Sequence, residues 1–339
     1  MDDGMRFDHL LRLSTPLGVY EHALLDEPRT EHGVCIDDVS RALVVTSRVA
    51  DPSPAIAELA RTCLDAVCSA GHDDGLMHNR RNPDGTWGDE ASTGDHWGRA
   101  LWALGVAATT SVDPVVASRA ADAAATAMRG RSRWLRSTAY AVLGAGAILD
   151  ADPDNRAARA LLRDSRSTLR RARMDRTWPW PEDSLTYANA VLPQAMLVLG
   201  RHLDLSDLRD DGRYLLTWLI DQQMLDGHLS VVPTSGRARW AAPTVGFDQQ
   251  PIEVAALAEA CRTAYVETGH DRWRATIEVC VAWFEGDNDS RTPVRDDETG
   301  AGYDGLERHG VNQNRGAEST LAWLATQQLS LVDRASVPG

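Results

Sequence analysis

The chain contains no lysine, so all 35 of its basic residues are arginines. Without a lysine amine there is no Schiff-base nucleophile, no pyridoxal phosphate linkage and no Walker-type phosphate loop. A Ser-x-x-Lys acylase is excluded for the same reason. Any catalysis must therefore rest on other groups, such as carboxylates, histidines and arginines.

Long apolar runs and paired cysteines are missing as well. No stretch approaches the roughly 18 apolar residues of a membrane-spanning helix. The acidic start MDDGMRFDHL lacks the apolar segment of a secretory signal, so we expect a cytoplasmic protein with no membrane partner. The five cysteines are scattered without CxxC spacing, which favours buried free thiols. The net charge of −14 disfavours nucleic acid as a partner.

Metal and nucleotide motifs are equally scarce. HExxH and the usual zinc spacings are absent. The Asp-Asn-Asp string at 287–289 resembles the start of a calcium loop, but Arg291 and Pro293 do not continue one, so we interpret it as a solvated turn. Gly-Ala-Gly at 144–146 lacks the third glycine of a dinucleotide fingerprint and indicates helix packing. We therefore expect neither a metal nor a cofactor.

Helical periodicity dominates what remains. In 54–68, apolar residues from Ile56 to Val67 recur at spacings of three and four, which predicts one buried helix face. Similar amphipathic segments lie at about 54–70, 114–129, 156–173, 206–225 and 271–285. Segments that are apolar around most of their circumference, and therefore buried on both sides, lie at about 37–49, 95–109, 133–149, 187–200, 250–266 and 315–331.

The two kinds of segment alternate along the chain. Such alternation predicts an all-α fold, an (α/α)6 toroid in which an inner ring of apolar helices is surrounded by an amphipathic outer ring. We expect one domain over 1–339, in which residues 1–30 pack on the ring and 334–339 form a flexible tail. Residues 5–14 could supply the sixth outer helix. A solenoid is disfavoured because the segments have no fixed repeat length.

The connections between helices differ in length. Connections from inner to outer helices are short, whereas those from outer to inner helices are long and rich in Gly, Trp, His and carboxylates. The long connections are 71–94, 174–186, 226–249 and 286–314. In a toroid they all emerge at one end, and polar residues gathered on long loops at one end of a rigid scaffold are typical of a binding site.

These long connections supply the candidate substrate-binding residues. Taken singly, several have a structural explanation: Asp38, Asp95 and Asp248 stand where helix-capping acids occur, and Trp178 and Trp180 could anchor a loop. Their joint recurrence favours a pocket. We predict substrate contacts from Glu31, His32, Asp37, His78, Asn79, Arg80, His96, Trp97, Arg99, Trp178, Trp180, Tyr187, Asn189, His228, Asp248, Gln249, Gln250, Glu253, Tyr303, Asn312 and Asn314.

This mixture of residues suits carbohydrate chemistry. Carboxylates, amides and arginines bind vicinal hydroxyls, and two carboxylates flanking a glycosidic bond can serve as general acid and general base. Burial beside Trp178 and Trp180 would raise the pKa of Glu182, as a general acid requires. We therefore predict Glu182 as the acid and Asp304 or Glu318 as the base. The alternative catalytic carboxylates are Asp38, Asp95, Asp248 and Glu253.

Several long strings resemble a bacterial family of (α/α)6 domains. They are EHGVCIDDVSRAL, GDHWGRALWALG, WPWPEDSLTYANAVLP, FDQQPIEVAALAEA and GYDGLERHGVNQNRGAESTLAWL, and the resemblance spans about residues 30–330. Members of this family are described as glycosyltransferases or glycosyltransferase-associated domains, and occur near mannoside-processing enzymes. The resemblance implies the toroid fold and a carbohydrate setting, similar to inverting glycoside hydrolases and sugar epimerases. A transferase is disfavoured because no nucleotide-binding α/β pattern is present.

Three functions follow as expectations. The first is an inverting, exo-acting glycoside hydrolase whose partner is a mono- or short oligosaccharide, with mannosides among the candidates. The second is a sugar isomerase or epimerase, which two histidines could serve as proton carriers. The candidate histidines are His32, His78, His96, His228 and His309. The third is a non-catalytic glycan-binding domain.

Overall fold

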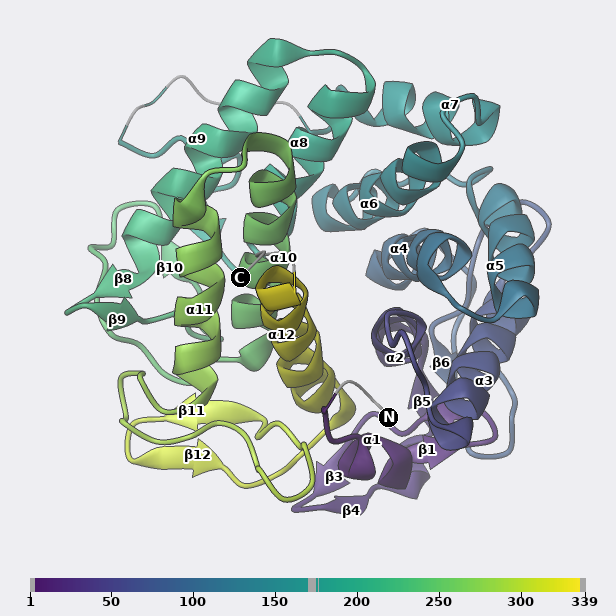
Figure 1. Cartoon of the computed structure of the whole chain (residues 1–339), viewed down its shortest axis with the longest axis horizontal. Helices are drawn as coiled ribbons and strands as arrows, with labels where there is room; N and C mark the ends of the chain where they lie inside the picture. The colour runs from purple at the N-terminus through teal and green to yellow at the C-terminus, as the bar shows by residue number, and fades with distance from the viewer. Residues whose placement is uncertain (1–3, 170–174, 176, 336–339) are drawn as a thin grey trace.

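The computed structural model describes residues 4–169, 175 and 177–335. Among these residues, six helices form an inner ring around a central axis, which can be followed in Figure 1. Each inner helix contacts the next, and the last contacts the first, so that the ring closes. The inner helices are α2 (Ile36–Ser47), α4 (Asp95–Thr110), α6 (Leu135–Ala151), α8 (Val191–His202), α10 (Pro251–Thr268) and α12 (Ala317–Ala335).

A second layer of helices surrounds this ring (Figure 1). Its members are α3 (Pro54–Ala70), α5 (Pro114–Ala127), α7 (Arg156–Ser165), α9 (Ser206–Gln223) and α11 (Asp271–Phe284). The short helix α1 (Asp8–Arg12) contacts α12 and α3. The all-α prediction, an (α/α)6 toroid, is confirmed.

The ends of the chain and one loop are described only in part. Helix α7 ends at Ser165, earlier than the expected end at 173, and residues 170–173 of that segment lie outside the described residues. Residues 1–3 of the expected N-terminal segment and 336–339 of the expected tail lie outside them too. Within the described residues, no helix combines the length and apolar character that crossing a membrane demands.

Burial explains the two kinds of helix. In α3 the apolar stripe that contains Ile56, Cys63 and Leu64 is buried, while the charged residues of the helix are exposed. The side chain of Ser53 accepts a hydrogen bond from the Ile56 N–H at 3.4 Å and caps this helix. In α6 nearly every residue from Arg136 to Leu149 is buried, because other helices cover both of its sides.

Small residues allow the inner helices to pack closely. A Cβ atom added at Gly144 of α6 would lie 2.1 Å from the carbonyl oxygen of Leu101 in α4. A Cβ atom at Gly105 of α4 would lie 2.3 Å from the carbonyl oxygen of Gly144. The two backbones therefore touch, which confirms that the glycines at 144–146 serve helix packing.

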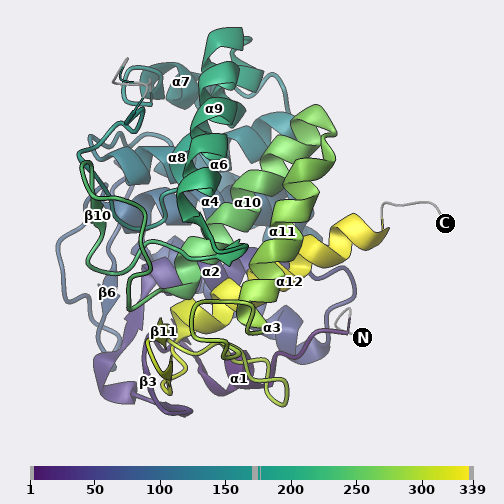
Figure 2. The ribbon, with the colours of Figure 1, turned by 90° about the vertical axis from the view of Figure 1, so that its left-hand side faces the viewer.

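The long connections gather at one end of the ring, the left side of Figure 2. Short antiparallel strand pairs lie in these connections and in the N-terminal segment before α2; they were not predicted, because two or three residues are too few for an alternating pattern. The pairs are β1 (Ser14–Thr15) with β2 (Gly18–Val19), β3 (Ala23–Leu24) with β4 (Glu27–Pro28), β5 (Val34–Cys35) with β6 (Arg80–Arg81), β7 (Ser184–Leu185) with β10 (Arg237–Ala238), β8 (Met224–Leu225) with β9 (His228–Leu229), and β11 (Gly305–Glu307) with β12 (Gly310–Asn312). A 3-10 turn, η1, spans Thr30–His32.

Candidate functional site

A polar cavity of about 350 Å³ opens among these connections, at the N-terminal ends of the inner helices. We call it the front cavity. Helices α2, α4 and α12 contribute to its wall, together with the N-terminal segment and three of the long connections. Because the N-terminus of a helix carries a partial positive charge, carboxylates are stabilised at this end of the ring.

The front cavity brings together nine of the residues predicted from the sequence. They are Asp37, Asp38, Arg80, Arg99, Asp248, Gln250, Asn312, Asp304 and Glu318. The wall also contains side chains that the sequence analysis did not select: Glu21, His22, Cys35, Arg41, Thr234 and Ser319. One signal was available for Arg41, which is the one basic residue of the inner helix α2.

Two carboxylates of the front cavity share one arginine. The Arg41 guanidinium donates to Asp38 Oδ1 at 2.5 Å through Nη1, and its Nη2 lies 2.8 Å from Glu318 Oε2. Asp38 and Arg41 are buried, whereas the Glu318 side chain is partly exposed. Because both carboxylates are bonded to the same guanidinium, they lie less than about 10 Å apart. Paired acids in glycosidases are separated by roughly 5–10 Å.

Asp38 is surrounded by other acidic groups. Its pKa is raised to about 7, chiefly by burial; the positive charge of Arg41 opposes this increase, while the negative charges of Glu318, Glu21 and Asp37 add to it. Atoms of Glu21, Cys35 and Asp38 lie within 4.8 Å of one another. A carboxyl group with this pKa retains a proton near neutral pH and can act as a general acid.

Asp37 has the opposite character although it adjoins Asp38. Burial alone would raise its pKa, but the arginines Arg99 and Arg41 lower it to about 2. Arg99 donates to Asp37 Oδ1 at 2.6 Å. Asn79, from the loop after α3, donates to the other carboxylate oxygen at 3.3 Å. Asp37 is therefore a fixed negative charge in the wall.

Asp304 lies in the part of the wall formed by the loop before α12. Burial raises its pKa, partly offset by hydrogen bonds from the Gly316 N–H and the Ser319 side chain. The Gly316 N–H donates to Asp304 Oδ1 at 2.7 Å. The loop before α12 thus holds this carboxylate at the cavity, and its position suits a hydrogen bond to a ligand hydroxyl.

A second polar cluster lies beside the cavity, around Arg136 of α6. Its guanidinium donates to Glu182 Oε1 at 2.9 Å and to the Asn189 side-chain oxygen at 3.3 Å. Asn189 in turn donates to Glu253 Oε2 at 2.8 Å. Burial raises the pKa of Glu253 to about 7. Neither Glu182 nor Glu253 lines the front cavity, so the structure does not bring the expected acid to the expected base.

Tyr187 connects this cluster with α4. Its hydroxyl donates to Asp95 Oδ2 at 2.6 Å, and its ring lies 4.5 Å from the Arg136 guanidinium. Asp95 also lies 3.8 Å from Arg99, which does line the front cavity. Asp95 therefore contacts a residue of the wall, and Tyr187 contacts Asp95, but neither lines the front cavity itself.

The predicted tryptophans lie within the protein rather than at the cavity. Trp97 is buried, and its indole N–H donates to the Ala127 carbonyl at 3.1 Å. Trp178 and Trp180 are buried against Trp218 of α9, with ring centroids 5.2 and 6.0 Å away. These large apolar rings gain more from packing between the helical layers than from a polar wall.

The expected histidines also lie elsewhere. His96 contacts the Met77 carbonyl at 2.9 Å, and His78 stacks on Trp87. His228 forms a buried pair with Asp289 at 2.8 Å. None of His32, His78, His96, His228 and His309 lines the front cavity, whereas His22 does. The ring of His22 packs edge-on against that of His32, with centroids 5.2 Å apart.

The remaining predicted residues serve the loops. The side chain of Gln249 donates to Asp289 at 2.5 Å, and the Asn314 side chain accepts from the Leu25 N–H at 2.9 Å. The Tyr303 hydroxyl accepts from Arg315 at 3.4 Å. Glu31 pairs with Arg29 at 2.9 Å on the surface. These hydrogen bonds and ion pairs explain why polar residues stand at these positions, and no ligand is needed to account for them.

The interpretation of 287–289 as a solvated turn holds for Asp287, which is exposed, and is wrong for Asn288 and Asp289. Asn288 is fully buried, and its side chain donates to the carbonyls of Trp283 and Thr292, both at 2.8 Å. Asp289 is buried with His228. The string is polar because it ties two long connections together inside the protein.

One group in the front cavity has metal-ligand atoms at suitable spacing, formed by Glu21, Cys35 and Asp38. Two observations oppose cation binding there. Arg80 and Arg41 hold the two carboxylates. Burial raises the pKa of the Cys35 thiol well above its ordinary value, and a metal would require the thiolate. The donor set therefore does not fit a resident metal.

Comparisons with known proteins show which fold this is. No family model and no curated protein matches the chain. Among solved structures, a sugar epimerase from a ruminal bacterium is similar over 98% of this chain and 96% of its own, with 13% identity and a TM-score of 0.68. The corresponding values for a cellobiose 2-epimerase from Spirochaeta thermophila are 97%, 94%, 13% and 0.65.

A cellulase of C. cellulolyticum in complex with cellobiose is similar as well. The likeness covers 94% of this chain and 88% of the cellulase, with 9% identity and a TM-score of 0.65. At such identities the likeness concerns the fold, and the toroid is common to these structures. The chemistry must be argued from the residues of this chain.

Proposed function

We propose that the chain is a carbohydrate-active enzyme, an inverting glycoside hydrolase in which Asp38 is the general acid and Glu318 the general base. The observation that carries this proposal is the pair of carboxylates on Arg41, one buried with a pKa of about 7 and one reaching solvent. Asp38 replaces Glu182 as the acid, because Glu182 does not line the front cavity. The similar epimerases and cellulase support the carbohydrate setting.

The two carboxylates divide the reaction between them. Asp38 gives its proton to the glycosidic oxygen as the bond to the anomeric carbon breaks, so that the leaving sugar departs as an alcohol. Glu318 removes a proton from a water molecule, whose oxygen forms the new bond to the anomeric carbon. Arg41 contacts both groups, and its positive charge stabilises the carboxylate that Asp38 becomes.

The rest of the front cavity suits a small neutral sugar. Asp304, Asp248, Gln250 and Asn312 offer acceptors and donors to hydroxyl groups. The lining residues include no Trp, Tyr or Phe, so recognition rests on hydrogen bonds rather than on stacking. A cavity of about 350 Å³ has room for only a small sugar, which favours removal of a terminal sugar from a short chain.

Digestion of short oligosaccharides, with mannosides and glucosides first, tests the proposal. Wild-type protein should release a monosaccharide whose first-formed anomer, observed by NMR, is inverted. Asp38→Asn and Glu318→Gln should each abolish release, whereas Glu182→Gln serves as the matched control and should remain active. Retention of the anomer, or full activity of Asp38→Asn, contradicts the assignment.

A second candidate, a sugar isomerase or epimerase, is favoured by the position of His22. Its imidazole lines the front cavity 3.7 Å from the Glu21 carboxylate. An imidazole and a carboxylate, both able to carry a proton, therefore face the same space. Proton exchange next to a carbonyl carbon requires such groups. Incubation of mannose, glucose and cellobiose in deuterated water decides between the two functions: deuterium at C2 that is lost in His22→Gln supports the isomerase.

A further inference from the structure

The exposed aromatic side chains of the described residues gather mainly at one end of the ring. Four are exposed, namely Trp134, Tyr187, Tyr214 and Trp240. Tyr214 lies on the outer helix α9, whereas the other three stand on successive connections, which precede α6, α8 and α10. The front cavity opens at the same end of the ring, where α2, α4 and α12 contribute to its wall. We call Trp134, Tyr187 and Trp240 the aromatic rim.

An arginine lies over each ring of the aromatic rim. The pairs are Arg133 over Trp134, Arg136 over Tyr187 and Arg239 over Trp240, with the guanidinium 4.5, 4.5 and 4.6 Å from the ring centroid. Attraction between a guanidinium and the face of an aromatic ring holds the ring in one orientation. The three aromatic residues nevertheless remain 53%, 43% and 81% exposed, in the same order. Each ring therefore offers an ordered apolar surface to solvent.

Tyr187 joins the aromatic rim to the front cavity. Its hydroxyl donates to Asp95 Oδ2 at 2.6 Å, and Asp95 lies 3.8 Å from Arg99, which lines the cavity. Trp134 is the N-cap residue of α6 and stands two residues before Arg136, whose guanidinium donates to the Tyr187 carbonyl. A ligand that leaves the cavity beside Arg99 therefore approaches Tyr187 and the start of α6.

Trp240 lies farther along the same end of the ring. Strand β10, two residues before Trp240, pairs antiparallel with β7, two residues before Tyr187. The two rings therefore follow opposite ends of this strand pair, which spaces them along the surface. The connection that carries Trp240 also begins and ends at the front cavity, because Thr234 and Asp248 line it and the Thr234 N–H donates to the Asp248 carbonyl at 2.8 Å.

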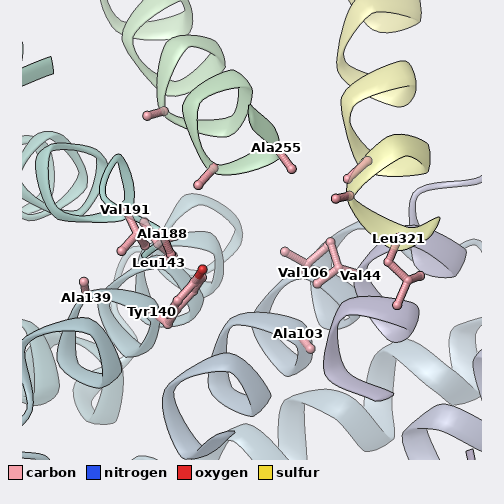
Figure 3. Packing of buried hydrophobic residues seen from close by; sticks show 14 of the residues in the cluster. Val44, Ala103, Val106, Ala139, Tyr140, Leu143, Ala188, Val191, Ala255 and Leu321 are labelled. Carbon is pink, nitrogen blue, oxygen red and sulfur yellow. The ribbon is translucent and has the colours of Figure 1, made fainter. Parts of the chain in front are cut away.

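A long ligand cannot continue from the front cavity through the ring. The space on the ring axis measures about 30 Å³, against about 350 Å³ for the front cavity, with which it shares Arg41. Apolar side chains such as Val44, Leu143 and Leu321 line this space, and Figure 3 shows them around the centre of the ring. Because the axial space is too small for a sugar ring, the remainder of an oligosaccharide must leave across the front end, where the aromatic rim lies.

The chemistry of the aromatic rim suits neutral sugars. A pyranose has an apolar C–H face that packs on an aromatic ring and a polar edge that remains in water. Two of the rim arginines already pair with carboxylates, Arg136 with Glu182 and Arg239 with Asp175, so they do not require an anionic ligand. We propose, resting on the function proposed above, that the aromatic rim binds the leaving-group sugars of a neutral oligosaccharide whose terminal sugar occupies the front cavity.

The dependence of affinity on chain length tests this proposal. Calorimetry with glucose to cellotetraose and with mannose to mannotetraose, on Asp38→Asn where the wild type hydrolyses the sugar, should show affinity rising by about tenfold or more along at least one series. Tyr187→Ala, Trp134→Ala and Trp240→Ala should each reduce this rise by about three- to tenfold, the strength of an ordinary ring contact. Tyr187→Phe keeps the ring and should restore the rise. Tyr214→Ala, a tyrosine of similar exposure on α9, is the matched control and should not alter it.

The outcomes separate this proposal from the function of the front cavity. Absence of hydrolysis, with a rise in affinity that the three alanine variants reduce, would overturn the hydrolase and support the aromatic rim. Equal affinity for mono- and tetrasaccharides in both series, no binding of either series, or a rise that the three variants leave intact overturns the rim. Sedimentation of the same variants checks the other occupant: if Trp240→Ala converts a dimer into a monomer and leaves sugar affinity unchanged, the rim is an interface between copies of the chain and the proposal fails.

Discussion

Asp38 and Glu253 are two buried carboxyl groups at the same end of the ring, and burial raises the pKa of each to about 7. Their surroundings differ. Asp38 lines the front cavity and shares Arg41 with Glu318. Glu253 receives hydrogen bonds from Asn189, and its other oxygen has no partner among the described residues. A raised pKa therefore indicates burial, whereas chemistry also requires access to a ligand.

The largest expected effect separates these two groups by activity. Asp38→Asn keeps the volume of the side chain but removes the proton that the leaving group needs. Turnover should fall by about 10²–10⁴-fold, the usual contribution of a general acid. Steady-state hydrolysis of the substrate found in the digestion panel measures this change, with Glu253→Gln as the comparison. Equal losses in both variants would contradict the distinction drawn between the two sites.

The pH dependence of turnover is the next effect in size. Asp38 must be protonated to act as an acid, so turnover should fall as pH rises through its pKa of about 7, by about tenfold per pH unit at the limit. Glu253→Gln should leave this alkaline limb in place, because Glu253 does not line the cavity. A wild-type profile that stays flat from pH 6 to 9 would exclude Asp38 as the acid.

The sequence predicts the double ring well because periodicity records which helix faces are covered. The sequence also indicates Asp38, Asp304 and Glu318 as candidates, because each is an acidic residue in the first turn of an inner helix or in the connection before one. It could not rank them, since the direction of a side chain relative to the ring axis depends on tertiary packing. Glu21 and His22 escaped notice because the N-terminal segment was expected only to pack on the ring.

Glu182 shows again that the sequence does not give the direction of a side chain. Its neighbours Trp178 and Trp180 suggested an apolar pocket, but both rings pack against Trp218 of the outer helix α9. The amino-acid sequence does not show whether a tryptophan side chain points to the ring axis or to the outer layer of helices. The buried arginines of inner helices, such as Arg41 and Arg136, are the better signal, because a buried guanidinium requires a carboxylate nearby.

A smaller effect is expected for Glu182→Gln. The glutamine oxygen can still accept from Arg136, which keeps its other hydrogen bonds to Thr186 and the Tyr187 carbonyl. Turnover should therefore stay within a few-fold of wild type, while the free energy of unfolding falls by about 1 kcal/mol. Urea titration and the same hydrolysis assay measure the two quantities. Loss of turnover in a variant of normal stability would restore Glu182 as a catalytic group.

The smallest effect on activity, with a distinct effect on stability, is expected for Glu253→Gln. The pKa of Glu253 is about 7 in the folded protein against an ordinary value of 4.5, so the folded state binds the proton more tightly than the unfolded chain. The free energy of unfolding should therefore decrease as pH rises from about 4.5 to 7 and then level off. At roughly 1.4 kcal/mol per pKa unit, this contribution amounts to a few kcal/mol.

Glutamine removes that titration, because an amide fits the buried position without ionising and still accepts from Asn189. Urea unfolding at pH 5, 6, 7 and 8 should show a shallower decrease for Glu253→Gln than for wild type, and the variant should be the more stable protein at pH 8. Asp38→Asn offers a parallel measurement at the front cavity, where Arg41 loses a charged partner and the gain should be smaller. Identical pH slopes in wild type and Glu253→Gln would mean that Glu253 is ionised in the folded protein, held by Arg136 more strongly than its burial opposes.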